Sequence, residues 1–460
     1  MKKNILVLLC LILLSACTAT GGGWQDDGEK MLHYEYKVWE VTQTFTPTIT
    51  PTATPPHTQT PQPTYTPYPT QTPYPTYTPV PTWTPNAPTV ACNFFVDPHG
   101  DDANAGTEAQ PWETMQHAFS SLIAGDTLCM RGGIYTTHYN SGVLSESGTK
   151  EQPITITNYP GEQVQIQINR PNYPADIGWS AFTCRTTAND PNDYIDFVRV
   201  IGTKVESKLL SNGVESDYGI IVRGMMGEDV AQASGFWIVS NCNHWEIAGI
   251  DMLDVGYGIF SKKKTYQTIY DYSPDNLYIH DNRVRVFYSE VGIQLNGSYN
   301  VVENNQVHKV TDIKVTNYGC AMINLLGHHN HVTGNDLQSA GSPLSCLGVM
   351  FEWDISDYSL IENNRIDVTG WGYKGSVVFA GGDNNIVRNN TITGTAEEWY
   401  YIYSDANCSY GGWPCNELTH ARSILPANDP AAPDYEYFYD PRNGLTTGNQ
   451  VYDNVYVRVE

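Results

Sequence analysis

The chain repeats one line of sequence: LYIHDNRV at 277–284, NVVENNQV at 300–307, NHVTGNDL at 330–337, SLIENNRI at 359–366 and NIVRNNTI at 385–392. Each copy carries an apolar residue, two polar residues, an asparagine, a variable residue and a second apolar residue. The asparagines follow one another at steps of 23, 30, 29 and 26 residues: Asn282, Asn305, Asn335, Asn364 and Asn390. A repeat of this length, with short strands and no helical pattern, indicates a β-solenoid whose coils differ in their loops.

A second strand-like segment follows each copy. These segments are GIQL from Gly292, CAMIN from Cys320, LGVMF from Leu347 and GSVVF from Gly375. Gly258–Phe260 looks like an earlier member, and VYDNV near Val455 looks like a last, degenerate copy of the first line. Two or three short strands per coil stack on their equivalents at a spacing of ~4.8 Å. We therefore predict an all-β fold, a right-handed parallel β-helix.

The repeated asparagines are predicted to be structural. Asparagine tolerates the left-handed backbone of a bend between strands, and its amide can bond the equivalent amide one coil along. A buried amide ladder explains the five residues without chemistry.

A solenoid needs a cover over its open end, because exposed terminal strands would pair with other molecules. The apolar residues of the segment from Pro111 to Gly125 recur at helical spacing, and they are Trp112, Met115, Phe119, Leu122 and Ile123. We expect a capping helix that begins at Pro111 and is stopped at Gly125. First strands are expected at Asp126–Met130 and Pro153–Ile156.

The N-terminus predicts export. Lys2 and Lys3 precede an apolar run from Ile5 to Leu14, and the run leads into Leu-Ser-Ala-Cys ending at Cys17. This run is too short to span a bilayer as a mature helix. LSAC resembles the bacterial lipobox, which implies that Cys17 is lipidated and anchors the protein to the outer face of the cell membrane. An ordinary signal peptide with an incidental cysteine is the alternative.

Composition divides the chain into four parts. We assign 1–17 to the signal and lipobox, leave 18–45 unassigned, assign 46–90 to a Pro/Thr-rich linker and assign 91–460 to the β-helix, with an insertion at about 406–443. Proline fixes φ and removes donors, so the linker is expected to be extended polyproline II. The formal net charge of -24 repels phosphate backbones and excludes nucleic acid as a partner. We expect a monomer.

Two segments carry a family resemblance: Phe94 to Thr136, with FFVDPHGDDANAG and GDTLCMRGGIYT, and Glu151 to Ile166, EQPITITNYPGEQVQI. They resemble the N-terminal portion of pectate-lyase-like β-helix proteins, notably family 9 polysaccharide lyases. The resemblance implies a lysine base and a calcium ion that neutralises a uronate carboxylate.

The calcium segment departs from that family pattern. The family has Ser-Asp-Asp-Gly-aromatic-Asp-Leu, and the nearest stretch here, SEVGIQL at 289–295, keeps one carboxylate at Glu290. Glu290 is therefore the one calcium ligand that the resemblance implies in this stretch. No lysine stands in a matching strand, and Lys374, in a later loop, is kept as a catalytic candidate.

A separate group of acidic residues lies in the segment FEWDISD at 351–357. In a strand, alternation places Glu352 and Asp354 on one face, with Asp357 in the turn after it. Neighbouring coils are expected to bring further polar residues near: Asn296, Asn324, His328 and His329. Such a groove suits cation binding or general acid/base cleavage of a glycan. A solvated acidic turn is the alternative.

Three other groups complete the candidates. Trp371 and Tyr373 are expected to stack on sugar rings. The HHNH histidines are interpreted as polar surface rather than a zinc site, because no cysteine or carboxylate lies at a familiar spacing. Eight cysteines remain beyond the signal, and two pairings are suggested, with free thiols as the alternative: Cys320 with Cys346 and Cys408 with Cys415.

Two classes of function remain open. The first is a surface enzyme that cleaves polysaccharide or cell-wall glycan by elimination or hydrolysis, and it is slightly preferred. The second is a non-catalytic glycan-binding or adhesive solenoid.

Overall fold

A computed structural model shows the fold of the chain beyond the linker. The residues that it describes are 91–137, 142–168, 179–185, 194–210, 214–224, 233–239, 241–262, 273–287, 291–309, 321–339, 347–352, 356–368, 376–380, 382–394, 400–404, 420–423 and 449–458. The signal, the lipobox cysteine Cys17 and the linker lie outside them. Among the described residues, no helix is both long enough and apolar enough to cross a membrane.

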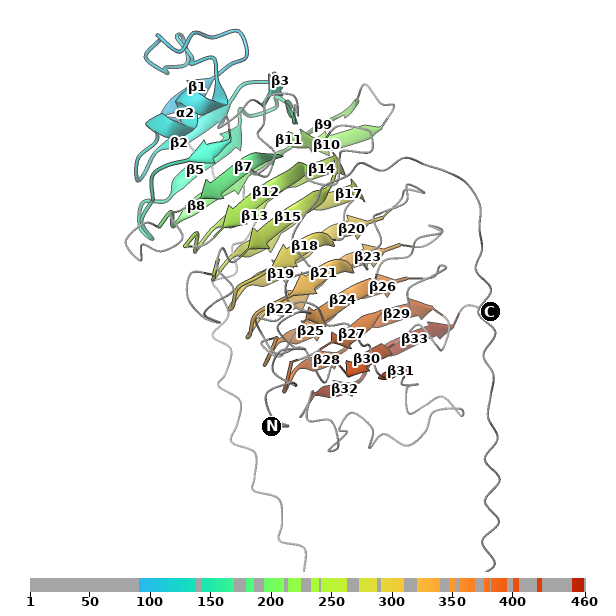
Figure 1. Ribbon diagram of the computed structural model, residues 1–460. Coiled ribbons are helices and arrows are strands. Elements are labelled where there is room, and N and C mark those ends of the chain that lie inside the picture. The colour runs from blue at the N-terminus through green and yellow to red at the C-terminus, as the bar shows by residue number, and fades with distance from the viewer. Residues whose placement is uncertain are drawn as a thin grey trace, which may run out of the picture. The chain divides into compact units, whose positions relative to one another are not determined.

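Three long sheets wind around one core as a parallel β-helix (Figure 1). Sheet 1 has eleven strands in the described part of the chain, all paired in parallel. Its strands, in spatial order, are β1 (Phe94–Val96), β2 (Thr127–Met130), β5 (Ile154–Asn158), β8 (Val198–Ile201), β13 (Glu246–Ala248), β16 (Tyr278–His280), β19 (Val301–Glu303), β22 (His331–Thr333), β25 (Leu360–Glu362), β28 (Ile386–Arg388) and β32 (Gln450–Tyr452).

Sheet 2 follows sheet 1 in each coil. Its ten described strands are also parallel, and each repeat asparagine lies directly before one of them. They are β3 (Gly133–Thr136), β6 (Val164–Gln167), β11 (Ile220–Arg223), β14 (Ile250–Val255), β17 (Arg283–Phe287), β20 (Gln306–His308), β23 (Asp336–Gln338), β26 (Arg365–Asp367), β29 (Thr391–Gly394) and β33 (Val455–Arg458).

Sheet 3 contains the predicted second segments of the repeat. Its described strands are parallel except the last, which pairs antiparallel with its neighbour. They are β4 (Val143–Leu144), β7 (Trp179–Arg185), β12 (Ala233–Val239), β15 (Tyr257–Lys262), β18 (Val291–Leu295), β21 (Ala321–Leu325), β24 (Leu347–Glu352), β27 (Val377–Ala380), β30 (Tyr400–Ser404) and β31 (His420–Ser423). The parallel β-helix predicted from the repeat is therefore confirmed.

The core consists of apolar side chains at matching positions of successive coils. Ile293, Ile323 and Val349 pair in register on β18, β21 and β24, and all three are fully buried. Alternation along each strand then turns their neighbours outward. This placement puts the other face of sheet 3, which carries both polar and aromatic residues, on the outside of the solenoid.

The asparagine ladder runs as predicted between sheet 1 and sheet 2. Each Nδ2 donates to the Oδ1 of the next asparagine, at 3.0 Å from Asn282 to Asn305 and 2.9 Å from Asn364 to Asn390. Asn390 continues the ladder to Asn454 at 2.9 Å, so the VYDNV segment is a true last coil. We call this connection the ladder turn.

The left-handed residue of the ladder turn precedes the ladder asparagine, so the expectation that the asparagine itself adopts this conformation is wrong. Positive φ values occur before the ladder asparagines at Asp281, Asn304, Gly334, Asn363, Asn389 and Asp453, and Gly249 has the same conformation before Ile250 in the coil upstream of the ladder. Glycine, asparagine and aspartate tolerate this conformation, whereas the following asparagine must keep its amide directed along the ladder.

A second connection, from sheet 3 to sheet 1, also has a left-handed residue in seven consecutive coils. We call it the rim turn, and its central residues have φ between 52° and 59°: Phe197, His244, Asn276, Tyr299, His329, Tyr358 and Asn384. The left-handed conformation costs roughly 1–2 kcal/mol for residues that carry a Cβ, and bulky residues rarely adopt it. Aromatic side chains at this position therefore carry a conformational cost.

The capping helix is shorter than predicted. Helix α2 spans Met115–Ser121, because Thr114 is its N-cap and accepts a hydrogen bond from the His117 amide at 3.1 Å. The Asp102 carboxylate holds the Thr114 hydroxyl at 2.6 Å. Trp112 lies before the helix and stacks on Phe94, at 4.9 Å between ring centroids. Ile123 lies beyond the helix and is 63% exposed.

A hairpin covers part of the outside of sheet 2. It consists of β9 (Lys204–Leu209) and β10 (Glu215–Tyr218), which pair antiparallel. Beneath it the fully buried Asp251 carboxylate accepts hydrogen bonds from Arg283 at 2.7 Å and from the Ser216 hydroxyl at 2.6 Å. Because this carboxylate is closed off from solvent, it belongs to the architecture rather than to a site.

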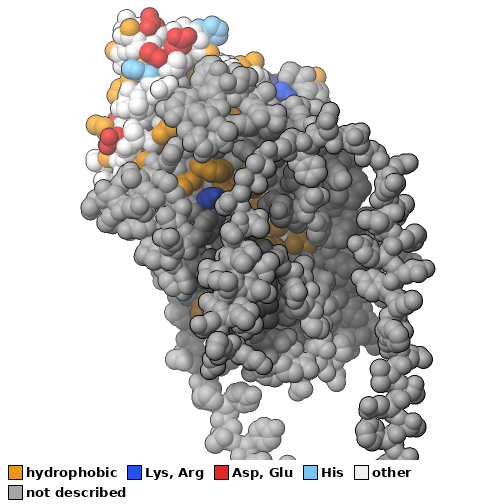
Figure 2. Space-filling model, in the orientation of Figure 1, with side chains coloured by type: hydrophobic (Ala, Val, Ile, Leu, Met, Phe, Trp, Pro, Cys, Tyr) orange, Lys and Arg blue, Asp and Glu red, His pale blue; other side chains and the backbone are white. Residues whose placement is uncertain are grey.

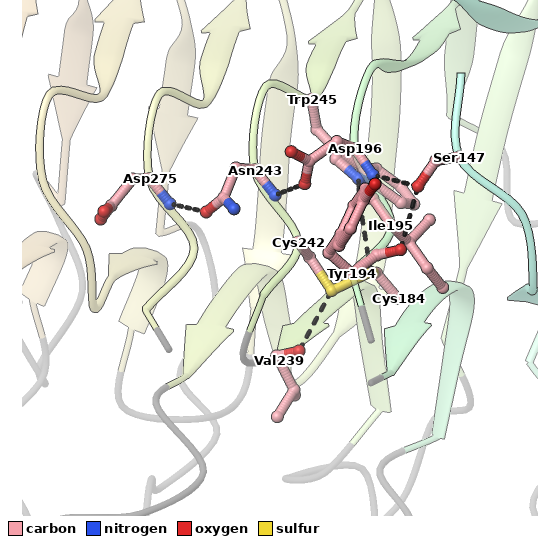
Figure 3. Close-up of a disulfide and its surroundings, with 10 residues drawn as sticks. All are labelled: Ser147, Cys184, Tyr194, Ile195, Asp196, Val239, Cys242, Asn243, Trp245 and Asp275. Atoms are coloured by element: carbon pink, nitrogen blue, oxygen red, sulfur yellow. Dashed lines mark hydrogen bonds between the residues drawn. A yellow bond between two sulfur atoms is a disulfide. The ribbon is translucent and has the colours of Figure 1, made fainter. Parts of the chain in front are cut away.

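Two disulfides join coils at the N-terminal end, Cys92–Cys129 and Cys184–Cys242. Figure 3 shows the second of them below the rim turns. The two pairings suggested from the sequence, Cys320 with Cys346 and Cys408 with Cys415, lie outside the described residues. Four of the eight cysteines therefore form disulfides that the spacing of cysteines in the sequence did not predict.

Candidate functional site

The candidate site is the outer face of sheet 3. Gln294 of β18 pairs in register with Asn324 of β21, and Asn324 pairs with Met350 of β24. These three residues form one outward column across successive coils. Glu352 lies two residues beyond Met350 on the same face, whereas its neighbour Phe351 is fully buried in the core, as alternation predicted.

The structure brings two of the predicted residues into contact. Asn324 Nδ2 donates to Glu352 Oε2 at 2.5 Å, and Asn324 is only 4% exposed. The carboxylate can only accept, so it fixes the orientation of the amide. The Asn324 Oδ1 atom is buried and has no hydrogen-bond partner among the described residues.

Asn296 lies on the same face but does not touch Glu352. It follows β18 directly, and its backbone amide donates to Ser261 Oγ at 3.1 Å. Register places it two coils before Glu352, which corresponds to a separation on the order of 10 Å. Asn296 and Glu352 could therefore contact neighbouring units of one extended ligand, but not the same atom.

The two candidate histidines lie in the rim turn at the end of sheet 3. His328 Nδ1 and His329 Nδ1 are 2.8 Å apart, and the His329 amide donates to the Asp357 carbonyl at 2.8 Å. Burial lowers the pKa of both imidazoles, and the neighbouring His329 lowers that of His328 further. Both rings are therefore neutral near pH 7.

Asp357 is engaged within the rim. Its Oδ1 accepts a hydrogen bond from the Asp383 amide at 2.6 Å, so the carboxylate braces the turn of the next coil. A catalytic role for Asp357 stays a prediction.

Several predicted site residues lie outside the described residues: Asp354, Lys374, Trp371, Tyr373 and Glu290. Within the described part of the chain, no group of three or more His, Cys, Asp or Glu side chains is placed to hold a metal ion. Of the described strands β12, β15, β18, β21 and β24, only β24 contains an acidic residue, Glu352. Calcium at Glu290 therefore stays a prediction.

An aromatic pair on the same face was missed from the sequence. Trp237 of β12 stacks on Phe260 of β15 with ring centroids 4.5 Å apart, and Tyr257 leans on Phe260 at 4.6 Å. Phe260 pairs in register with Gln294, so these rings continue the polar column. Figure 2 shows hydrophobic side chains at the surface over β12 and β15. Extending the second segment one coil upstream, to Phe236 and Trp237, would have found the pair.

Comparison with known proteins agrees with this architecture. A family model described as a Pel9A-like, right-handed β-helix region matches residues 94–342, which is more than half of the chain. The match includes Asn296, Asn324 and both histidines, and it ends before Glu352.

Two curated proteins are similar over shorter stretches. The chain is 37% identical over 89 residues to pectate lyase PEL9 of Emericella nidulans, which covers 19% of this chain and 22% of that protein. It is 39% identical over 72 residues to the uncharacterized protein YwoF of Bacillus subtilis, covering 16% of this chain and 15% of that protein. Each match spans less than a quarter of the relative.

Solved structures with a related shape are distant in sequence. A GH136 lacto-N-biosidase from Eubacterium ramulus has a TM-score of 0.42 at 14% identity, over 80% of this chain and 68% of that one. Pectate lyase Pel9A has a TM-score of 0.36 at 16% identity, over 65% of this chain and 63% of that one. On the evidence of the family match and of the coils themselves, the chain belongs to the family of proteins with a Pel9A-like right-handed β-helix region.

Proposed function

We propose that this is an exported, lipid-anchored protein that acts on polysaccharide through the outer face of sheet 3. The signal ending at Cys17 and the extended linker at 46–90 support a position outside the cell membrane. The name of one relative, a pectate lyase, supports a glycan as the substrate class.

One observation carries the proposal. The Asn324 amide is fixed by Glu352, and its buried oxygen has no partner among the described residues. A buried acceptor without a partner is costly, and a ligand hydroxyl would satisfy it once the atoms that cover this oxygen move aside. Sugar hydroxyls are such donors, and the half-buried Trp237, stacked on the buried Phe260, offers a ring for the apolar face of a sugar.

Within this proposal Glu352 is the acid/base residue. It is half-buried, its geometry is fixed by Asn324, and it lies on the proposed groove. An elimination can proceed with one carboxylate as the base, whereas hydrolysis ordinarily uses a pair, and Glu352 is the one acidic residue on the described strands β12, β15, β18, β21 and β24. Glu352 is therefore assigned as the general base of a lyase reaction.

A non-catalytic glycan-binding protein is the second candidate. It is favoured by the presence of one acidic residue, rather than two, on the described strands of the groove. In this case Glu352 only orients Asn324, and the face binds the glycan without cleaving it.

The test compares Glu352→Gln and Asn324→Ala with wild type, using polygalacturonate and neutral polysaccharides. For an enzyme we expect Glu352→Gln to reduce product release at least about 100-fold while binding changes little. Asn324→Ala should weaken binding in both cases. Glu303→Gln is the matched control, because Glu303 is a half-buried glutamate on sheet 1 that accepts a hydrogen bond from the Tyr278 hydroxyl at 2.8 Å.

The outcomes separate the two candidates. Binding without product from any glycan favours the binding protein. Wild-type protein that neither binds nor cleaves any glycan contradicts the proposal as a whole. Repeating the binding measurements with a chelator tests the calcium prediction at Glu290.

A further inference from the structure

The rim turn contains a stack of rings, two of them exposed, that the site proposed on sheet 3 does not use. Tyr299, His329 and Tyr358 occupy the central position of three consecutive rim turns. The ring centroids of Tyr299 and His329 are 5.0 Å apart with 21° between planes, and those of His329 and Tyr358 are 5.2 Å apart with 23° between planes. We call these three residues the ring strip.

The backbone of the ring strip adopts a conformation that bulky residues rarely take. All three residues have a left-handed φ, although Asn276 and Asn384 show that asparagine fits the same position in other coils. Stacking between the rings offsets part of this cost. Strained residues that persist on a surface point to a function, and here the rings remain accessible, with Tyr299 49% and Tyr358 47% exposed.

The strip rests on a rigid base. The Tyr358 amide donates to the Asp383 carbonyl at 2.9 Å, and the Tyr299 amide donates to the His328 carbonyl at 3.1 Å. The His328 ring also packs edge-on against Tyr299, at 5.3 Å between centroids. The positions of the rings are therefore set before any ligand arrives, which reduces the entropy lost on binding.

A column of polar side chains precedes the central residues and ties successive rim turns together. The Asn243 amide donates to Asp196 Oδ1 at 3.0 Å, and the Asp275 amide donates to Asn243 Oδ1 at 2.9 Å, as Figure 3 shows. The Ser298 amide then donates to Asp275 Oδ1 at 2.7 Å. The His328 amide in turn donates to Ser298 Oγ at 3.1 Å, so this column ties the rim turns from Asp196 to His328 to one another.

The charged residues near the ring strip determine which ligand charge it accepts. None of the rim-turn residues at 273–277, 296–300, 326–330, 356–360 and 382–386 is Lys or Arg. His328 and His329 have lowered pKa values and are neutral near pH 7, while Asp357 and Asp383 lie in the adjacent turns. A polyanion such as a polyuronate finds no cation among these described rim-turn residues and meets the carboxylates of the adjacent turns, which do not repel a neutral chain.

The shape favours a linear chain over a protein surface. The strip presents one ring per coil, with tyrosine hydroxyls as polar tips, along a row that is one residue wide. A stable protein interface buries about 800 Å² per partner, more than such a row offers. Aromatic rings with polar tips bind molecules that combine apolar CH faces with hydroxyl groups, as sugars do.

We propose that the ring strip is a binding site for a neutral polysaccharide, separate from the groove on sheet 3. The proposal rests on the glycan-directed function above but uses different residues. The strip holds a neutral chain along the rim, beside the C-terminal ends of the sheet 3 strands.

The test is a titration of the full-length protein with xylohexaose, cellohexaose, mannohexaose and polygalacturonate. The double variant Tyr299→Asn, Tyr358→Asn should bind at least one neutral hexasaccharide about tenfold or more weakly than wild type. Asparagine suits the left-handed turn, so we expect the melting temperature to be retained. His244→Asn, at the same position of a coil outside the strip, is the control and should bind like wild type.

A second double variant keeps the proposal testable if the asparagine double variant does not fold. Tyr299→Phe, Tyr358→Phe keeps the stack and removes two hydroxyls, and its affinity should fall by a smaller factor, roughly two- to fivefold. Unchanged affinity of both double variants for every neutral hexasaccharide, with Asn324→Ala still weakening binding, overturns the ring strip alone. Wild-type protein that binds no glycan overturns both proposals. Binding of polygalacturonate alone, lost in the asparagine variant, overturns the assignment of a neutral chain.

Discussion

The ladder turn and the rim turn both connect one sheet to the next through a left-handed residue, but they use different residue types there. Both have a left-handed central residue in several consecutive coils. From the coil of Tyr299 onward the next residue is polar in both turns, and it accepts from the backbone amide one coil before, as Asn335 does for Asn305 and Asn330 does for Asn300. In the ladder turn the left-handed residues are glycine, asparagine or aspartate, whereas in the rim turn five of the seven described residues carry rings.

The difference separates architecture from surface function. The ladder turn uses the residues that adopt the left-handed conformation most easily, and its amides are buried. The rim turn places bulky rings in the same conformation and exposes two of them by almost half. Stability alone favours the first solution, so the second is where binding is expected.

The largest expected effects on stability come from removing a buried asparagine from the ladder turn or from the rim turn. Asn335→Ala removes an acceptor for two donors of Asn305, at 2.9 and 3.0 Å, and a donor to Asn364 at 2.9 Å. We expect the free energy of unfolding to fall by about 3 kcal/mol, because buried partners are left unsatisfied. Asn330→Ala, in the rim turn, should lower it by about 2 kcal/mol. Urea denaturation measures both, and an equal or larger loss for Asn330→Ala contradicts the ranking.

A smaller loss is expected where the ladder turn uses glycine. Gly334 has a φ of +66°, and an added Cβ would lie 2.4 Å from Asn304 Oδ1. Gly334→Ala should lower the free energy of unfolding by about 2 kcal/mol, from backbone strain and this contact. Gly161→Ala is the control, because Gly161 has a φ of +77° and nothing within 4 Å of its Cβ position. Thermal denaturation should show a smaller loss of stability for Gly161→Ala than for Gly334→Ala. Equal losses would show that the contact between the added Cβ and Asn304 Oδ1 contributes nothing.

Exchanging central residues between the turns sharpens the comparison further. Asn363→Tyr places a ring in the ladder turn and should lower the free energy of unfolding by about 1–2 kcal/mol. Tyr358→Asn removes a ring from the rim turn, relieves strain and loses one stacking contact, so the change should stay within about 1 kcal/mol. Calorimetry of both variants checks this, and a larger loss for Tyr358→Asn would show that the rings serve stability.

The smallest expected effect is a pH dependence of the rim. The pKa values of His328 and His329 lie below the ordinary value of 6.5, so the unfolded chain takes up protons before the folded one does. Stability is fully retained above pH 6.5 and falls as the pH drops below it. The His328→Gln, His329→Gln double variant should lose less stability than wild type between pH 7 and pH 5. An identical pH profile for both proteins argues against neutral, buried imidazoles.

Much of the fold could be predicted from the sequence because the repeat leaves a chemical signature. Each coil needs the same amide at the same place, so Asn282 to Asn390 recur as a residue type and predict the stack of coils. The register then predicts that Asn324 and Glu352 lie close, which the 2.5 Å contact confirms.

The central residues of the rim turn left no such signature, because their constraint acts on φ rather than on residue type. Tyr299, His329 and Tyr358 share a backbone conformation without sharing an identity, so nothing in the repeat predicts their stacking. The disulfides were missed for a related reason, since Cys92 and Cys129 are 37 residues apart and Cys184 and Cys242 are 58 residues apart. Such pairs follow from how the coils are wound, which the spacing of cysteines does not contain.

Amide hydrogen exchange of the full-length protein, with and without a bound oligosaccharide, tests the central claim most directly. If a glycan lies across sheet 3 and its rim, exchange should slow at 291–300, 321–330, 347–352 and 356–360, while the sheet 2 strands β20, β23 and β26 stay unchanged. Slowed exchange confined to sheets 1 and 2, measured under conditions where binding is saturated, would contradict the account.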